Sequence, residues 1–145
     1  MGGLSDLQAF MLGFPLLLIP FAIYNIIAFL IPSVMWTDIV STVHMVSGGA
    51  WTMSAGDMLV TLAIVLLYGE VIKSTRIGLR TVVTHALSLI LFLAMLVEFI
   101  LVKQAATATF FLLLVVSFFD VLGGFAVTLR SAQRDITVEG VERVL

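Results

Sequence analysis

Three acidic residues lie inside long apolar stretches of this 145-residue chain: Asp57, Glu98 and Asp120. At the centre of a bilayer an ionised carboxylate costs roughly 2.5–3.5 kcal/mol. No Lys or Arg is expected at the depth of these three side chains. Carboxyl groups in such positions bind protons or cations, or pair with polar side chains on other helices. The three acids are therefore the first candidates for chemistry.

Two of the acids are expected at the same level of the membrane. Counting about 1.5 Å per residue places Asp57 and Glu98 roughly 6–8 Å below one boundary, with Asn25 at a similar depth. If their helices face each other, the two carboxyl groups meet, and both cannot stay ionised without a bound cation. The cluster therefore predicts a proton or cation site. The alternative is that these shallow acids simply reach water.

Asp120 is predicted near the midplane, roughly 15 Å from the end of its stretch. His85, on the preceding stretch, is expected about 6 Å nearer that same end. A carboxylate and an imidazole at this distance can pass a proton, or can join two helices by a hydrogen bond. Asp120 and His85 thus complete the predicted proton or cation site.

Small residues mark one side of the last apolar stretch. They predict close packing against another helix, because small side chains let two backbones approach. The neighbour belongs to this chain or to a second copy, so we expect a homo-oligomer or a partner membrane subunit. The helix-packing residues are Ser117, Gly123, Gly124 and Thr128.

The elements that position these residues are predicted from composition. Hydrophobic residues make up 61% of the chain and charged residues 11%, which excludes a water-soluble domain and makes the lipid bilayer its solvent. Four stretches are long enough to span a bilayer, at about 8–30, 52–72, 79–102 and 106–129. Residues 1–145 are therefore predicted to form a single transmembrane domain, an all-α integral membrane protein built as an antiparallel four-helix bundle. Pro15 and Pro20 predict a kink in the first helix.

Residues 31–51 form the one long connector. Apolar residues recur with helical spacing over 33–46, so we expect a short amphipathic external helix lying on the membrane surface. The alternative is a re-entrant segment in which Gly48 and Gly49 line a pore. The tail at 130–145 is expected to be a solvated extension or a docking segment.

The distribution of basic residues predicts the orientation of the bundle. Lys73, Arg76 and Arg80 lie in the connector after the second stretch, and further arginines follow the fourth. Segments rich in Lys and Arg stay in the cytoplasm, so both termini are predicted to be cytoplasmic in a multi-pass protein of the inner (plasma) membrane. No cleavable signal peptide is expected.

Several classes of function are disfavoured by composition. The chain has no cysteine, two histidines and a net charge of -2, so we expect no metal site, no cofactor and no nucleic-acid partner. A haem held by His44 and His85 is disfavoured because the two residues are predicted at different depths. No catalytic motif is recognisable, so an enzyme is not expected.

Two functions remain. The buried polar residues favour a small oligomeric protein that moves protons or small cations through the bundle. The alternative is a non-catalytic subunit, assembly factor or scaffold of a membrane complex, whose polar groups hold helices together.

Overall fold

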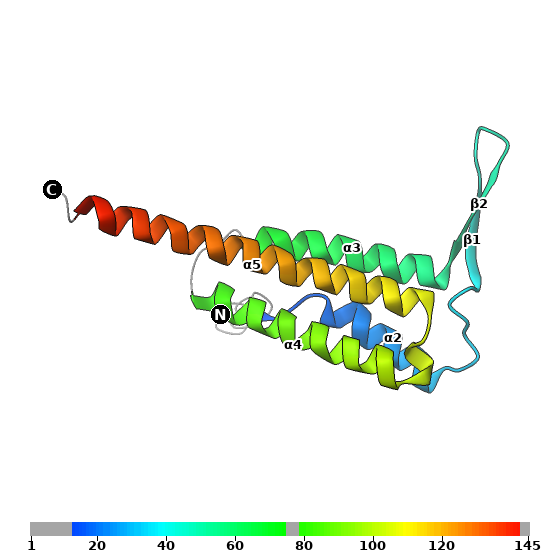
Figure 1. Cartoon of the computed structure of the whole chain (residues 1–145). Helices are drawn as coiled ribbons and strands as arrows, with labels where there is room; N and C mark the ends of the chain where they lie inside the picture. Colours follow the sequence, from blue (N-terminus) through cyan, green and yellow to red (C-terminus); the bar gives the residue numbers. More distant parts are fainter. Residues whose placement is uncertain (1–12, 75–78, 143–145) are drawn as a thin grey trace, which may run out of the picture.

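The computed structural model describes residues 13–74 and 79–142 (Figure 1). Within these ranges the chain forms four α-helices, one 3₁₀ turn and a two-stranded antiparallel sheet. The elements in chain order are α2 (Leu18–Leu30), β1 (Ile39–His44), β2 (Ala50–Ser54), α3 (Ala55–Ser74), α4 (Leu79–Leu101), η1 (Lys103–Ala105) and α5 (Ala108–Glu142).

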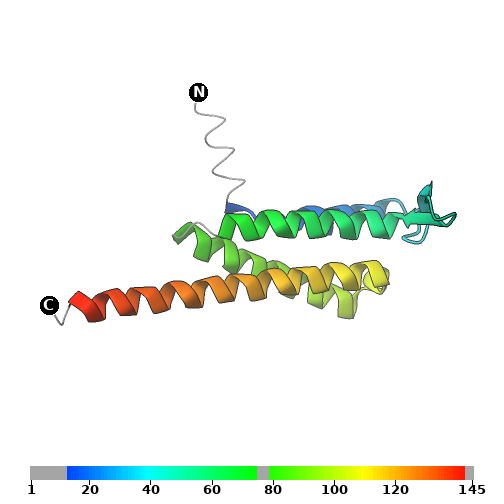
Figure 2. The same ribbon diagram turned by 90° about the horizontal axis from the view of Figure 1, so that it is seen from above.

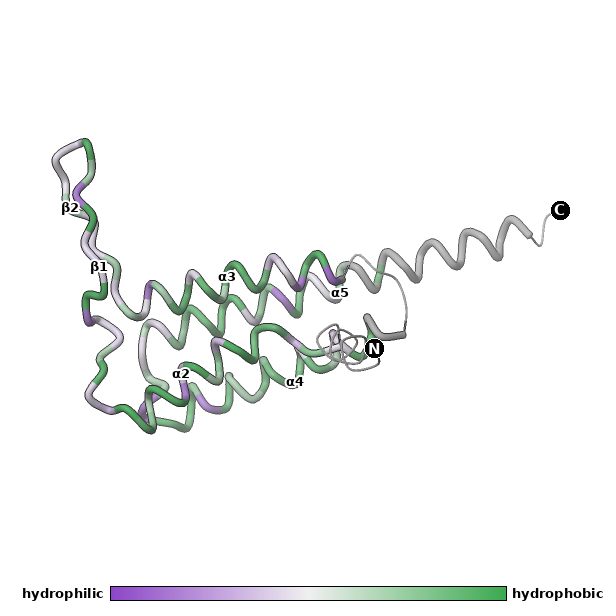
Figure 3. Tube along the Cα trace, turned by 180° about the vertical axis from the view of Figure 1, so that it is seen from behind, coloured by the Kyte–Doolittle hydropathy of each residue, from purple (hydrophilic) through white to green (hydrophobic). Residues whose placement is uncertain are grey.

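Three of these helices are long and apolar enough to cross a membrane. The crossing segments are Ala55–Lys73 in α3, Val82–Leu101 in α4 and Ala108–Ala126 in α5. Apolar residues dominate the described parts of these helices, and hydrophilic positions are few (Figure 3). These segments agree with the predicted second, third and fourth stretches, and with a mostly helical, multi-pass membrane protein.

The first predicted stretch, 8–30, differs from the structure because its described part is interrupted. Helix α2 has only 13 residues, about 20 Å of helix, which is short of a bilayer of about 30 Å. Pro20 stands in the first turn of α2, where its missing N–H is not needed. The carbonyls of Pro15 and Leu16 accept hydrogen bonds from Leu18 and Ile19, at 3.1 and 3.0 Å. The prolines therefore accompany a break before α2 rather than a kink within one long helix.

The helices pack as two layers. One layer holds α2 and α3, and the other holds α4 and α5 (Figures 1 and 2). Helix α5 packs against both α3 and α4, whereas α2 packs mainly against α3. As a result α3 and α4 stand at opposite corners of the bundle, although only a short segment joins them in sequence. Polar residues on α3 and α4 therefore meet only where they both reach α5.

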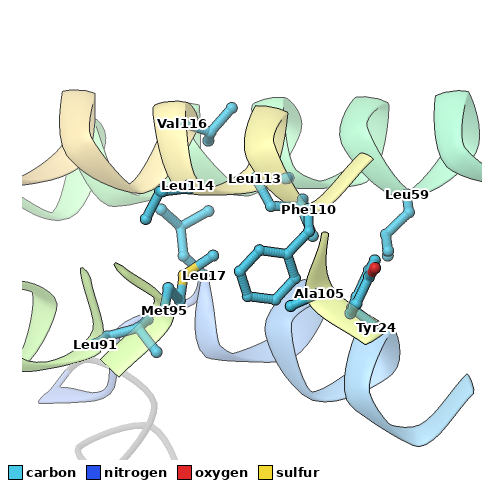
Figure 4. Packing of buried hydrophobic residues seen from close by; sticks show 11 residues of the cluster. Leu17, Tyr24, Leu59, Leu91, Met95, Ala105, Phe110, Leu113, Leu114 and Val116 are labelled. Carbon is cyan, nitrogen blue, oxygen red and sulfur yellow. The ribbon is translucent and has the colours of Figure 1, made fainter. Parts of the chain in front are cut away.

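The core is centred on Phe110, which is fully buried near the start of α5. Its ring lies 4.8 Å from that of Tyr24 in an edge-on arrangement and 6.1 Å from that of Phe99. Around it gather apolar side chains from α3, α4 and the residues preceding and within α2 (Figure 4). The buried cluster comprises Leu17, Tyr24, Leu59, Ala63, Leu91, Met95, Ala105, Phe110, Leu113, Leu114 and Val116.

The prediction of an amphipathic helix over 33–46 is wrong. Strands β1 and β2 form a β-hairpin there, with Val43 opposite Trp51. Four of the five residues from Ile39 to Val43 are β-branched, which favours extended backbone, and Gly48 adopts a positive φ of 83° in the turn. The re-entrant alternative also fails, because Gly48 and Gly49 are exposed at the hairpin tip, away from the helices (Figure 1).

Candidate functional site

The candidate site is a group of polar side chains between α3, α4 and α5, about two thirds of the way along the bundle from the hairpin. We call it the polar cluster, and its members are Glu70, Lys73, His85, Ser88 and Asp120. Asp120 on α5 is 7% exposed and Ser88 on α4 is 2% exposed, so both are enclosed by protein. Counted from the hairpin ends of their helices, these five residues lie at similar depths, roughly 18–27 Å.

Glu70 and Lys73 form the ion pair of this cluster. Their side chains lie one turn apart on α3, with Lys73 Nζ 3.0 Å from Glu70 Oε2. The sequence suggests an ordinary pair at the membrane boundary, but Glu70 is only 4% exposed. Lys73 Nζ also donates a hydrogen bond to the carbonyl of Phe14 at 2.7 Å, and Glu70 accepts one from the backbone N–H of Leu16.

These hydrogen bonds explain how the break before α2 is tolerated. A backbone N–H or C=O that leaves a helix inside a membrane needs a partner, because no water is present to supply one. The ion pair on α3 supplies a donor to Phe14 and an acceptor to Leu16. The charged pair therefore holds the interrupted segment against α3.

Asp120 lies within the electrostatic reach of this ion pair. The charged and titratable side chains that act on its carboxyl group are Glu70, His85 and Lys73, and Ser88 is its polar neighbour. We expected no basic residue at this depth, but Lys73 turns into the bundle, and its side chain is 15% exposed. Lys73 forms its ion pair with Glu70, and among the described residues Asp120 has no ion pair of its own. The cluster carries one more negative charge than positive charge when both acids are ionised and His85 is neutral.

His85 occupies the face of α4 that meets α5. Its ring packs on the backbone of Gly124, so closely that a Cβ at Gly124 would come within 2.7 Å of His85 Cγ. Within the described part of the chain, the Nε2 atom of His85 and the hydroxyl of Ser88 are buried without a hydrogen-bond partner. A pocket of about 240 Å³ opens beside His85, lined by Val82, His85, Ala86, Leu89, Val121, Gly124 and Phe125. The site therefore holds unused hydrogen-bonding capacity next to Asp120.

The predicted cluster of Asp57, Glu98 and Asn25 is only partly assembled. Asn25 Nδ2 lies 3.3 Å from Glu98 Oε2, so these two residues do meet across α2 and α4. Asp57 is exposed at the start of α3, where its carboxylate accepts hydrogen bonds from the backbone and hydroxyl of Ser54 at 2.9 and 2.7 Å. Asp57 caps its own helix, and it does not face Glu98 because α3 and α4 stand at opposite corners.

The predicted packing residues fall into different environments. Ser117 is 2% exposed, and Gly124 carries the contact with His85. Gly123 would meet no atom within 4 Å if it gained a Cβ, so it faces open space. Thr128 belongs to α5, but its side chain lies outside the described residues. The two histidines are far apart, since His44 is exposed on the hairpin and His85 lies in α4.

Sequence reasoning missed Glu70, Lys73 and Ser88 as parts of one site. The available signal was the proline pair in the first apolar stretch, which frees backbone groups that need polar partners. Within residues 13–74 and 79–142 no group of three His, Cys, Asp or Glu side chains could hold a metal ion. Comparison with protein-family models, curated proteins and solved structures finds no match to this chain.

Proposed function

We propose that this protein moves protons across a membrane and that Asp120 is the group that takes up and releases them. The observation that carries the proposal is the burial of Asp120, which is 7% exposed and has no ion pair among the described residues, while the ammonium group of Lys73 is paired with Glu70. A buried carboxylate without a cation of its own is neutralised at least cost by a proton.

The surroundings of Asp120 favour exchange of a proton from one side. His85 lies nearer the end of the bundle opposite the hairpin, and its free Nε2 is suited to relay protons to or from the carboxyl group. Toward the hairpin most buried side chains are apolar, such as Leu91, Met95 and Phe110, and the few buried polar ones include Ser117. Transfer across the membrane therefore needs a second conformation, so the proposal is a gated proton pathway rather than an open pore.

The hairpin end supplies a second group that could exchange protons. Glu98 is hydrogen-bonded to Asn25 through one oxygen, and its Oε1 atom is buried without a partner. In the proposal Glu98 and Asn25 accept the proton once the apolar core between them and Asp120 opens.

Protons are favoured over small cations by the composition of the site. Hard cations bind to several oxygen ligands at once, usually with more than one carboxylate. In the polar cluster Lys73 already occupies the carboxylate of Glu70, which leaves the carboxylate of Asp120 alone. We therefore expect proton flux without flux of sodium or potassium.

The direct test is proton flux into liposomes that carry the purified protein and enclose a pH-sensitive dye. Asp120→Asn should lower the flux at least about tenfold, because an amide cannot carry the proton. The matched control is Asp57→Asn, which changes an exposed carboxylate of the same type and should leave the flux unchanged. Equal flux through wild type and Asp120→Asn would overturn the proposal.

We also propose that the protein resides in the inner membrane with both termini in the cytoplasm. The support is the concentration of Lys and Arg after α3 and toward the end of the chain. The chain has no cysteine, so a single Thr42→Cys substitution gives a unique label on the polar side of the hairpin, where residue 42 is exposed. A membrane-impermeant thiol reagent should label it from outside intact spheroplasts; labelling only after lysis would reverse the orientation.

A second candidate function is a non-catalytic subunit, assembly factor or scaffold. The observation that favours it is the length of α5, which continues for 16 residues beyond its crossing segment of Ala108–Ala126. This extension projects past the other helices and offers a helix for a partner subunit or a second copy (Figure 1). The scaffold function predicts that a chain ending at Leu129 loses its oligomer or complex in native mass spectrometry, with no proton flux in either form.

A further inference from the structure

The β-hairpin has two chemically different faces. Residues directly opposite each other on paired strands share a face, so Val43 and Trp51 lie on the same side as Ser41 and Met53. The other side carries the pairs Thr42 with Thr52 and His44 with Ala50. We call these the apolar face and the polar face of the hairpin. The described part of the chain does not cover the apolar face, because Val43 is 44% exposed and Trp51 is 50% exposed.

The base of the hairpin is fixed to the helical bundle. The backbone N–H groups of Ala55 and Gly56 donate hydrogen bonds to the carbonyls of Asp38 and Trp36, each at 2.9 Å. The indole ring of Trp36 stacks on Tyr24 with the ring centres 4.5 Å apart. Strand β2 ends at Ser54 and α3 begins at the next residue, so the hairpin starts where a membrane-crossing helix begins.

The direction of the hairpin matches a membrane surface. It runs across the helix axes and projects sideways past α3 instead of continuing along the bundle (Figures 1 and 2). Helices that cross a bilayer run through its thickness, so an element that leaves them sideways at their end lies along the bilayer surface. The exposed apolar side chains of α3, beginning with Met58, continue directly from this level.

The charge of the hairpin also fits lipid. Residues 39–56 contain no Asp, Glu, Lys or Arg, and Val46 at the tip is fully exposed. An isolated two-stranded hairpin is only marginally stable in water and needs a partner for its apolar side. Tryptophan and aliphatic side chains without charges are suited to the boundary between lipid headgroups and acyl chains.

We infer that the hairpin is a membrane-surface anchor, whose apolar face and tip rest in the headgroup and upper acyl layer of the bilayer around the bundle. The lipid surface covers Val43, Trp51, Met53 and Val46, while Thr42, His44 and Thr52 face water. Because the segment is uncharged, this contact depends on apolar burial and needs no anionic lipid. The inference is independent of the proton function and holds for either orientation of the protein.

Nitroxide labels at adjacent residues provide the test. The chain has no cysteine, so Val43→Cys and Thr42→Cys each give one labelling site, and the two sites point to opposite faces. The full-length labelled protein is placed in phosphatidylcholine vesicles, and collisions with oxygen, which dissolves in lipid, are compared with collisions with a water-soluble nickel chelate. Val46→Cys reports the tip in the same way.

The label at residue 43 should show an oxygen-to-nickel collision ratio several-fold higher than the label at residue 42. The ratio at residue 46 should resemble that at residue 43, and neither should change with salt concentration. Equal, nickel-accessible labels at residues 42 and 43 would place the hairpin in water and overturn the inference. Shielding of residue 43 from both reagents would overturn it as well, because a second copy or another protein would then cover the apolar face.

Quenching of tryptophan fluorescence gives a check that leaves the apolar face unaltered. Trp36→Phe leaves Trp51 as the single tryptophan of the chain. Lipids brominated near the headgroup should quench its emission strongly, whereas iodide in the water should quench it weakly. The opposite pattern would contradict the anchor even if a cysteine variant failed to fold.

Discussion

Glu70 on α3 accepts a hydrogen bond from the backbone N–H of Leu16, which lies 54 residues earlier in the chain. A charged side chain inside a membrane-crossing segment is thus used to satisfy the backbone of the non-helical residues before α2. Lys73 completes the arrangement by neutralising Glu70 and by donating to the carbonyl of Phe14. The same ion pair belongs to the polar cluster that contains Asp120, so these two side chains serve both the residues before α2 and the candidate site.

The first prediction concerns this ion pair. Glu70→Gln should destabilise the protein by about 3 kcal/mol, because it leaves the Lys73 ammonium without its counter-charge in a buried site. The double variant Glu70→Leu with Lys73→Leu should cost less than the sum of Glu70→Leu and Lys73→Leu alone, because each single substitution leaves one charge of the pair unpaired and the double variant leaves none. Circular dichroism monitors unfolding in detergent and gives the free energy of unfolding of each variant. If the losses of stability of the single variants add up to that of the double variant, Glu70 and Lys73 are not coupled.

A second prediction compares two neighbouring glycines of α5. Gly124→Ala should lower stability by about 1–3 kcal/mol, because the new methyl group collides with the ring of His85. Gly123→Ala meets no atom within 4 Å and should raise helix stability by about 0.5–1 kcal/mol. The melting temperatures of the two variants in the same detergent test this prediction. Equal shifts of the melting temperature would contradict the contact between His85 and Gly124.

The third prediction tests the junction between α2 and the start of α5. The Tyr24 hydroxyl lies 2.8 Å from the carbonyl of Gln104 and 2.7 Å from the hydroxyl of Thr107. Tyr24→Phe should therefore cost about 1 kcal/mol, with the aromatic packing kept. Tyr68→Phe is the matched control, since Tyr68 is 69% exposed and should lose almost nothing. An equal effect of the two substitutions would show that the hydrogen bonds of the Tyr24 hydroxyl do not stabilise this junction.

The crossing helices were predictable because apolar length alone identifies them. The structure places α3 and α4 within about three residues of the stretches 52–72 and 79–102, and α5 begins two residues after 106. Depth counting also placed Asn25 and Glu98 at one level, and they are hydrogen-bonded. These predictions need only the helical rise per residue and the length of each apolar stretch, which can be read along the sequence.

Which helices contact each other within the bundle could not be predicted from the sequence. Asp57 and Glu98 share a depth but lie on helices at opposite corners, and sequence says nothing of which helices touch. The hairpin was missed because Ile39, Val40 and Val43 satisfy a helical spacing and a β-branched strand pattern equally over so short a segment. The sequence predicts only an interfacial ion pair for Glu70 and Lys73, because their site depends on the backbone of the distant residues Phe14 and Leu16.

Infrared spectroscopy offers the most direct test of the central claim that Asp120 takes up and releases a proton. Difference spectra of the membrane-embedded protein between low and high pH report the carbonyl stretch of protonated carboxylic acids. We predict a band component that is present in wild type and in Asp57→Asn, remains in Glu98→Gln, and is lost in Asp120→Asn. An unchanged difference spectrum in a folded Asp120→Asn protein would contradict the claim.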